Sequence, residues 1–329
     1  MPRLRNVAVA ALAALFAPGL FAIDLQNAPS ANPAAPGTLN YVEGTATLNG
    51  VPVTQRSVGR ADAQTGQVLA TQQGRAEMLL TPGVYLRLGK NSAAQMVSPD
   101  LTNTVVDVQH GQAAVEADQL FKQNDIHVVV NNVPVQIIKP GLYEFNADNN
   151  SVETFKGELA VDRGDGQWTT VKSGHQLTLA EGRGSKPAKF NKDAQEGSAL
   201  YRWSSLRSEY LAHANEQIAG AYGAGYAPGW YWDPYLWNYT FIGMNPFYSP
   251  FGFGFYPFGY MGGWGWGGGY YGGGFYGRGL YNHGHVNLPR GGFGGSAVHG
   301  EGLRAGGFGG GFHGGGGVHM SAGGFGGRR

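Results

Sequence analysis

The stretch IHVVVNNVPVQIIKPGLYEFN (residues 126–146) contains three short segments rich in β-branched and aromatic residues. Such residues favour extended strands. The segments are separated by Asn131-Asn132 and by Pro140-Gly141, which are typical turn pairs, because asparagine and glycine tolerate positive φ angles and proline fixes its own φ. The stretch therefore predicts consecutive β-strands joined by tight turns.

The same pattern extends in both directions, over residues 39–182. Turn residues recur about every ten residues, which is typical of an all-β sandwich, barrel or β-roll, and no predicted strand alternates with a helix. About 140 residues can bury a full core, so we expect this β domain to fold alone. The predicted strands cover residues 41–48, 51–53, 67–71, 75–80, 84–88, 104–108, 112–116, 126–130, 133–138, 142–146, 151–155, 158–162, 167–171 and 176–180.

After a polar linker over residues 183–193, apolar residues recur at steps of three and four. This period predicts one amphipathic helix over residues 194–219. Its apolar stripe must pack against another surface, either the β domain or a partner protein. The predicted stripe consists of Leu200, Trp203, Leu206, Tyr210, Ala214 and Ile218, whereas Arg202, Arg207, Glu209 and Glu216 fall outside it.

Two C-terminal segments have an unusual composition. Residues 220–242 are dense in tyrosine and tryptophan, and residues 243–329 hold most of the excess among the chain's 57 glycines. Ordering a glycine-rich chain costs conformational entropy, and few aliphatic side chains are present to offset that cost. We therefore expect residues 243–329 to be a disordered tail, in which Gly-Gly-Phe-Gly-Gly recurs.

The N-terminus has the composition of a secretory signal peptide. Arg3 and Arg5 precede an apolar run, and Ala22 offers a cleavage site. We expect a signal peptide over residues 1–22, a linker over residues 23–38, and a mature protein exported to the periplasm, the cell envelope or the exterior. No transmembrane segment is expected after cleavage, and the alternative is an uncleaved membrane anchor.

No motif points to catalysis or to a cofactor. The chain has no cysteine, so disulfides and cysteine nucleophiles are excluded, and it lacks the G-x-S-x-G and H-E-x-x-H patterns. We expect neither enzyme activity nor a cofactor, with a hydrolase built on His175 as the remaining alternative. The weak candidates for a metal site are His283 and His285, because imidazole binds zinc, copper and nickel. A net charge of +1 predicts no nucleic-acid partner.

Three segments resemble motifs of FecR-type periplasmic domains. Residues 85–92 resemble their strand–turn motif, residues 138–145 their proline-glycine strand entry, and residues 152–161, with Lys156-Gly157 at the centre, their closing hairpin. The resemblance covers about residues 40–180 and implies a β-rich periplasmic domain without catalytic residues. FecR relays a signal from an outer-membrane receptor to a sigma factor, so the resemblance also implies a possible regulatory role.

Our main hypothesis is a non-enzymatic envelope protein, in which the β domain is a scaffold or binding module and the tail makes multivalent contacts. Aromatic rings stack on sugars and on one another, and many contacts of about 1 kcal/mol add up through avidity. The expected partner is an envelope protein, a polysaccharide or a second copy of the chain. The alternative is a FecR-type regulatory signalling module, which binds a membrane partner through the β domain or the helix.

The predicted interaction residues lie in three segments. The pattern Tyr-x-Trp-x-x-x-Arg at residues 201–207, followed by Gly229-Trp230, resembles a Trp/Tyr-rich region of exported bacterial proteins. Large aromatic side chains and arginine are also the residue types that contribute most to binding interfaces. The predicted set is Trp203 and Arg207 in the helix, Trp230 and Trp232 in the aromatic segment, and Phe293, Phe308, Phe312 and Phe325 in the tail.

Overall fold

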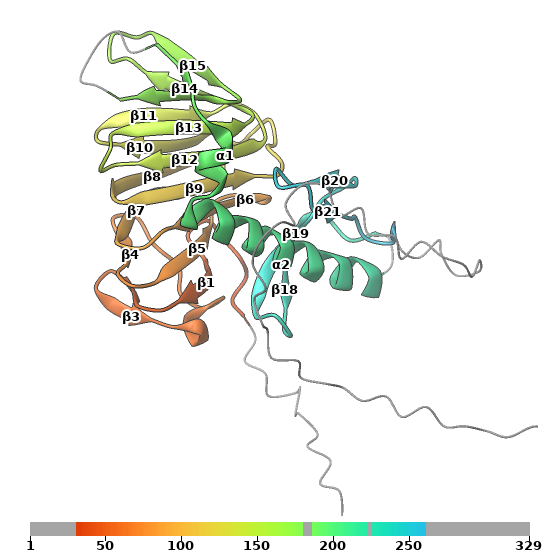
Figure 1. Cartoon of the computed structure of the whole chain (residues 1–329). Coiled ribbons are helices and arrows are strands. Elements are labelled where there is room, and N and C mark those ends of the chain that lie inside the picture. Colours follow the sequence, from red (N-terminus) through yellow and green to blue (C-terminus); the bar gives the residue numbers. More distant parts are fainter. Residues whose placement is uncertain (1–30, 180–185, 223–224, 261–329) are drawn as a thin grey trace, which may run out of the picture. The chain divides into compact units, whose positions relative to one another are not determined.

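The computed structural model describes residues 31–179, 186–222 and 225–260 (Figure 1). The predicted signal peptide and the chain beyond residue 260 lie outside the described residues. All described residues belong to one compact unit. Within them, strands form two large sheets and there is one long helix, so the predicted all-β fold with a single long helix is confirmed.

The two large sheets are almost entirely antiparallel, and the one parallel pair among the described strands joins β8 to β10. The eight-stranded sheet has the order β1 (Leu39–Glu43), β5 (Arg75–Leu79), β6 (Val84–Leu88), β9 (Gln112–Ala117), β12 (Gly141–Asn146), β13 (Ser151–Lys156), β16 (His175–Thr178) and β17 (Ala188–Lys189). The nine-stranded sheet has the order β15 (Trp168–Lys172), β14 (Glu158–Asp162), β11 (Val133–Ile137), β10 (Ile126–Val130), β8 (Asn103–His110), β7 (Ser92–Asp100), β4 (Val68–Thr71), β2 (Ala46–Leu48) and β3 (Val51–Val53). A short 3₁₀ helix, η2 (Gln55–Ser57), follows β3.

The two sheets enclose one hydrophobic core, which contains side chains from both (Figure 1). In β10, Ile126, Val128 and Val130 point into this core, whereas His127 and Val129 lie on the opposite face. Burying each such aliphatic side chain contributes about 1.5–3 kcal/mol. Alternate side chains of β10 therefore face the core.

The asparagine-containing turns adopt the backbone conformation that their composition predicts. Asn49 and Gly50 connect β2 to β3 with φ angles of 50° and 79°. Asn131 and Asn132 connect β10 to β11 with φ angles of 49° and 64°. Both residues of each pair thus occupy the left-handed region, which a two-residue hairpin requires and which asparagine and glycine tolerate best.

The predicted single helix is divided in two. α1 (Lys192–Glu196) ends at Gly197, and α2 (Ala199–Ala221) begins directly afterwards. Ser198 is the N-cap of α2, and its side chain accepts a hydrogen bond from the backbone N–H of Tyr201 at 3.1 Å. Serine satisfies an otherwise unpaired N–H group at this position, so the sequence Gly-Ser marks the break.

The helix packs against the β domain, on the outer face of the eight-stranded sheet, which answers the question that the sequence left open. The predicted stripe is correct for Leu200, Trp203, Ala214 and Ile218 but wrong elsewhere. Two of its members are exposed, and Arg207, which was placed outside it, is buried. The exposed members are Leu206 and Tyr210, at 46% and 43%, and the additional buried residues of α2 include Ser204, Ser208, Leu211 and Asn215.

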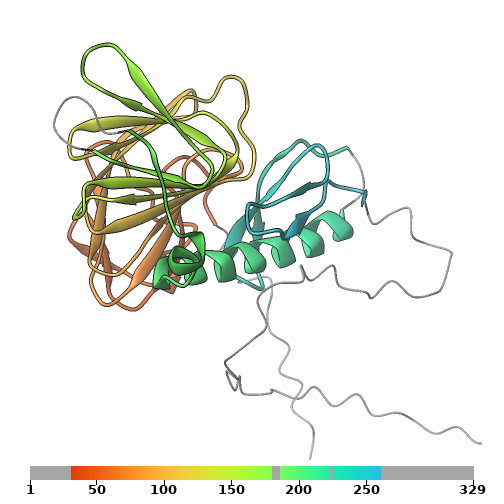
Figure 2. The same ribbon diagram turned by 45° about the horizontal axis from the view of Figure 1, so that its top comes forward.

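The aromatic segment and the first residues of the predicted tail form two small hairpins along α2 (Figure 2). β18 (Gly229–Asp233) pairs with β19 (Asn238–Ile242), and β20 (Phe247–Tyr248) pairs with β21 (Gly254–Phe255). The side-chain amide of Asn215 on α2 connects to both hairpins, because it donates to the carbonyl oxygens of Phe241 and Tyr256, each at 3.0 Å.

The predicted start of the disordered tail at residue 243 is therefore too early. Phe255 is fully buried, and it stacks on Phe247 with ring centroids 4.9 Å apart. These rings join a cluster with Leu79, Tyr85 and Leu211, which supplies the burial that a glycine-rich segment lacks by itself. Residues 247–255 therefore belong to the folded part of the chain.

Candidate functional site

The outer face of the eight-stranded sheet carries a buried row of charges beneath α2. Glu77, Arg87 and Glu116 lie on the neighbouring strands β5, β6 and β9, and none of the three side chains is exposed. Arg87 Nε donates to Glu77 Oε2 at 2.7 Å, and Arg87 Nη1 donates to Glu116 Oε2. We call these three residues the charged ladder.

Two residues of α2 complete the charged ladder. Arg207 Nη2 donates to Glu77 Oε1 at 2.9 Å, and Ser208 Oγ donates to Glu116 Oε1 at 2.6 Å. With Arg207 the cluster holds two positive and two negative charges. This balance matters because an unpaired charge costs several kcal/mol to bury, whereas opposite charges with good hydrogen bonds offset that cost.

The charges of the ladder persist despite their burial. Burial alone would raise the pKa of Glu77, but Arg207 and Arg87 outweigh it and lower that pKa to about 2. Burial likewise tends to lower the pKa of Arg87, and Glu116 and Glu77 raise it above its ordinary value. Both groups therefore stay ionised, and the ladder holds α2 on the sheet by ionic hydrogen bonds.

A buried carboxyl group next to the ladder behaves differently. Burial, followed by the charge of Glu116, raises the pKa of Asp118 well above its ordinary value. Asp118 is 7% exposed, and neither of its carboxyl oxygens has a hydrogen-bond partner within the described part of the chain. This environment favours the protonated form of Asp118, since a second negative charge beside Glu116 is unfavourable.

The sequence-predicted interaction residues of the helix lie inside this interface. Trp203 is 5% exposed and packs against Tyr41 with ring centroids 6.2 Å apart. Arg207 is 4% exposed, and its guanidinium lies 4.1 Å above the ring of Tyr41. Both side chains thus join α2 to the β domain, and a contact of either one with a partner stays a prediction.

The two tryptophans of the aromatic segment are half-buried. Trp230 packs edge-on against Tyr85, and Trp232 against Tyr239, with ring centroids 4.9 and 5.1 Å apart. A contact of these residues with a partner remains a prediction. The other predicted interaction residues, Phe293, Phe308, Phe312 and Phe325, and the metal candidates His283 and His285 lie outside the described residues.

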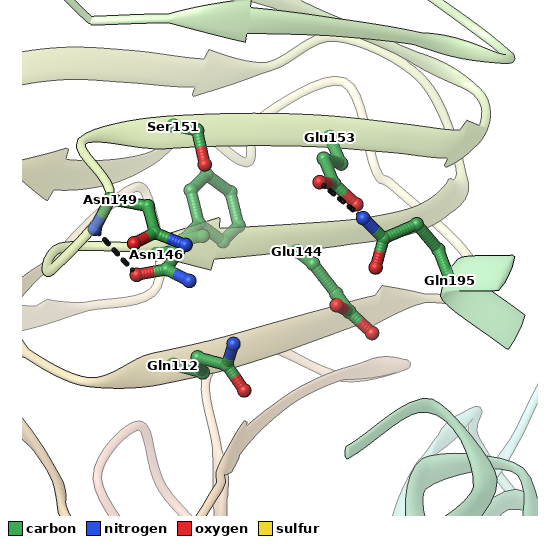
Figure 3. Close-up of a pocket in the computed structure, with 8 residues that line it drawn as sticks. Gln112, Glu144, Asn146, Asn149, Ser151, Glu153 and Gln195 are labelled. Carbon is green, nitrogen blue, oxygen red and sulfur yellow. Dashed lines mark hydrogen bonds between the residues drawn. The ribbon is translucent and has the colours of Figure 1, made fainter. Parts of the chain in front are cut away.

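Beyond the edge of α2, a polar pocket of about 110 Å³ lies on the same face of the sheet (Figure 3). Its two carboxylates, Glu144 on β12 and Glu153 on β13, are direct partners in the register of the two strands. Gln195 of α1 reaches over them, and its Nε2 donates to Glu153 Oε1 at 3.2 Å. The lining residues are Gln112, Glu144, Phe145, Asn146, Asn149, Ser151, Glu153 and Gln195.

The two pocket carboxylates are incompletely satisfied. Glu144 Oε1 and Glu153 Oε2 are buried, and neither accepts a hydrogen bond from the described residues. Burial, with a further contribution from Glu153, raises the pKa of Glu144 to about 8, and burial also raises the pKa of Glu153. The arrangement can therefore accept protons or a positively charged group.

Sequence reasoning missed both the charged ladder and the pocket carboxylates. All of these residues except Glu153 lie between two apolar residues on their strands, which is the usual pattern of a solvent-exposed face. Among the described residues, no three or more histidine, aspartate or glutamate side chains are arranged to hold a metal ion.

The residues that resemble FecR motifs have structural roles. The hydroxyl of Tyr143 donates to the carbonyl oxygen of Lys139 and accepts a hydrogen bond from the backbone N–H of Glu158 at 3.0 Å. Gly157 faces this hydroxyl with a φ angle of 89°, and a Cβ atom at this position would lie 2.1 Å from it. Only glycine fits, because both the φ angle and the space exclude a side chain.

Comparisons with known proteins give a weak structural similarity. Two crystal structures, at 2.50 and 1.65 Å resolution, of a protein described as a "putative anti-sigma factor" from Parabacteroides distasonis ATCC 8503 resemble this chain with a TM-score of 0.32 each. Sequence identity is 10% and 9%, and the matches cover 43% and 42% of this chain but only 64% and 63% of the other. No protein-family model and no curated protein matches the chain.

None of the described helices is both long enough and apolar enough to cross a membrane.

Proposed function

We propose that the chain is a non-enzymatic, exported binding module, whose folded part holds and presents its glycine-rich C-terminal segment to a partner in the cell envelope. The observation that carries this proposal is the interface beneath α2. Arg207 and Ser208 bond to the charged ladder, and the aromatic hairpins pack on the same sheet. The helix therefore belongs to the folded scaffold, and the scaffold continues up to the start of the glycine-rich segment.

The chemistry of the buried charges supports a structural role rather than catalysis. Strongly shifted pKa values often identify active sites, but ion-pair networks shift them as well. Glu77 and Arg87 are inaccessible to a substrate, because no part of either side chain is exposed. Their hydrogen bonds run to one another, to Glu116 and to α2.

The composition of the glycine-rich segment supports multivalent contacts. Its large apolar side chains are mostly aromatic rings on a glycine backbone, and each ring contact contributes about 1 kcal/mol. Several such contacts along one chain give useful affinity through avidity. A polysaccharide or another copy of the same segment offers the repeated flat surfaces that such rings bind.

Retention on envelope polysaccharide and sedimentation of the protein across a salt series test this proposal. We expect the chain truncated after residue 260 to lose binding. Binding should be weaker in a variant in which serine replaces Phe293, Phe308, Phe312 and Phe325. A variant with the arginines beyond residue 260 replaced by serine is the matched control. Binding should survive moderate salt, since ionic contacts alone are screened within about 10 Å at 0.1 M.

Loss of binding in the arginine variant, with full binding in the phenylalanine variant, would disprove the aromatic mechanism and indicate an acidic partner. Export is tested separately, by N-terminal sequencing of the mature protein. We expect it to begin at Ile23, whereas a protein that starts at Met1 or Pro2 in the membrane fraction contradicts the proposal.

A second candidate function is a FecR-type regulatory module. One observation favours it: α2 leaves Leu206 and Tyr210 exposed on the face that turns away from the sheet. An apolar surface of this kind on a firmly held helix is suited to binding a partner protein. A photo-crosslinker at residue 206 should then react with an envelope regulator in intact cells, whereas one at residue 216 should not; the absence of a crosslink at residue 206 argues against this candidate.

A further inference from the structure

We propose that the polar pocket beside α1 binds the positively charged end of a basic side chain, the guanidinium of arginine or the ammonium of lysine, presented by a partner protein. This inference goes beyond the proposed function, which concerns the glycine-rich segment. It rests on the arrangement of Glu144, Glu153 and their neighbours.

The first argument is the pairing of two like charges. Glu144 and Glu153 stand directly opposite one another on adjacent strands, and both side chains line the pocket (Figure 3). Like charges at such positions destabilise a sheet unless something compensates them. Each carboxylate also has one buried oxygen that accepts no hydrogen bond from the described residues. A cation with several N–H donors satisfies both oxygens at once.

The second argument is that the described chain supplies no such cation. None of its ion pairs includes Glu144 or Glu153. The lysines of the adjacent elements are bonded elsewhere: Lys156 donates to the carbonyl oxygen of Pro250, and Lys192 donates to that of Phe155 at 2.9 Å. The two pocket carboxyl groups thus have no cationic partner within the described chain.

The third argument concerns the chemical class of the occupant. The amide groups of Gln112, Asn146 and Gln195 add oxygen acceptors around the carboxylates. A guanidinium or ammonium group uses such a mixed set, because it forms charge-assisted bonds with carboxylates and ordinary hydrogen bonds with amides. A calcium ion takes six to eight oxygen ligands, usually with more than two carboxylates, and the described residues offer no third acidic ligand here.

Proton release gives a signature of this binding. The titratable groups that interact electrostatically with Glu144 are Glu153 from β13 and Tyr201 from α2. Burial and Glu153 raise the pKa of Glu144 to about 8, so this group is largely protonated at pH 7. A bound cation favours the ionised form, and binding at pH 7 should therefore release protons.

Titration of the full-length protein tests the proposal, with N-acetylarginine amide and N-acetyllysine amide as probes in isothermal calorimetry. We expect weak, saturable binding of at least one probe, with protons released at pH 7 and fewer released at pH 9. Glu144→Gln and Glu153→Gln should each weaken binding about tenfold or more. Glu158→Gln, which removes a carboxylate that pairs with Lys139 at 3.0 Å, is the matched control and should leave binding unchanged.

The probes also separate the possible occupants. Binding of the arginine probe alone indicates a guanidinium site, and equal binding of both probes indicates a site for any basic side chain; either result supports the proposal. N-acetylcitrulline amide has a similar shape without the charge and should not bind. The proposal is overturned if the citrulline probe binds as well, if calcium binds and the probes do not, if no probe binds, or if both glutamine variants retain full binding while thermal unfolding shows them to be folded.

Discussion

One row of residues crosses the outer face of the eight-stranded sheet. Its two halves differ in whether their acidic side chains have a partner of opposite charge. In the half beneath α2, Glu77 and Arg87 are opposite in sign and bond to each other. In the half beside α1, Glu144 and Glu153 are both acidic residues, and neither has an ion-pair partner among the described residues. The row follows the strand register from Tyr41 through Glu77, Arg87, Ala114, Glu144 and Glu153 to Gln176.

The contrast shows that a buried charged row depends on which partner side chains the two helices contribute to it. The helix-covered half receives Arg207 and Ser208 from α2, and its charges balance. The half that contains the pocket receives only the neutral amide of Gln195 from α1. Ala114 lies between the two halves, under Leu200 and Trp203. The N-terminal end of α2 therefore marks the boundary between the paired charges and the unpaired carboxyl groups. Replacements in the two halves should therefore change stability in opposite directions.

The largest effect is expected for Arg207→Leu. This change leaves Glu77 buried with one cation fewer, and it should lower the free energy of unfolding by about 3–5 kcal/mol. Urea denaturation followed by tryptophan fluorescence measures the loss. Arg202→Ala is the matched control, because Arg202 is exposed on the same helix and its replacement should cost less than about 0.5 kcal/mol. Equal losses in the two variants would mean that the ladder does not hold the helix.

The pH dependence of stability tests the contribution of Glu77 to the charged ladder. The folded pKa of Glu77, about 2, is lower than its ordinary value of 4.5. The folded state therefore binds this proton less readily than the unfolded state, and the stabilising contribution is complete above the unfolded pKa. We expect stability to fall as pH decreases from about 4.5 towards 2, with a shallower slope in Glu77→Gln. Identical slopes in the two proteins would contradict the lowered pKa.

A smaller loss is expected for Ser208→Ala. The hydroxyl of Ser208 is the donor to Glu116 Oε1 at 2.6 Å, and a buried carboxylate oxygen that loses its donor costs about 1–3 kcal/mol. Ser205→Ala, on a more exposed position of α2, is the control. We expect a lower melting temperature for Ser208→Ala than for Ser205→Ala. An unchanged melting temperature for Ser208→Ala would show that its hydrogen bond to Glu116 does not stabilise the folded protein.

Glu144→Gln should raise the stability of the folded protein, whereas the three replacements above lower it. The pKa of Glu144 is raised to about 8, so the folded protein keeps a proton that the unfolded chain loses above pH 4.5. The stability of the original protein therefore falls as pH rises from about 4.5 to 8, and then levels off. The glutamine variant lacks this decrease, and above pH 8 it should be more stable by up to about 2 kcal/mol, since partial solvent contact limits the effect. Denaturation curves at pH 5 and pH 9 test this, and a less stable variant at pH 9 would refute it.

The smallest effect is expected for Leu206→Ser, which removes an apolar side chain that is 46% exposed. Stability should change by less than about 0.5 kcal/mol. Leu211→Ser, a fully buried position on the same helix, provides the contrast and should be strongly destabilising. A large loss in Leu206→Ser would indicate that the outward face of α2 packs within the protein.

The parts of the fold that depend on local sequence were predictable. The β-branched and aromatic content of residues 126–146 identified β10, β11 and β12, and the pair Asn131-Asn132 identified the turn. β7 was missed, because Ser-Ala-Ala-Gln-Met-Val-Ser-Pro-Asp has small side chains and a proline, and its pairing with β4 and β8 is a tertiary effect.

The candidate site depended on information that the sequence pattern does not contain. The stripe on α2 was misassigned because the usual rule expects an apolar surface beneath a helix, whereas Arg207 and Ser208 face charges. The pocket depends on the register that sets Glu144 opposite Glu153 and also on Gln195, which reaches Glu153 from α1, and the local sequence of the hairpin does not predict this helix contact. The early tail boundary has the same origin, since the cluster that covers Phe255 is contributed by distant parts of the chain.

The first strand and the last large hairpin of the described chain close on one another. The buried side chain of Asn40, at β1, donates to the carbonyl oxygen of Tyr239 at 3.0 Å and accepts from its N–H at 2.6 Å, across 199 residues. The same amide also donates to Glu77 Oε1 at 2.8 Å, and this partner lies only 37 residues away along the chain. During synthesis from the N-terminus onward, Asn40 can therefore bond to Glu77 early, whereas its two bonds to Tyr239 must wait until β19 has been made.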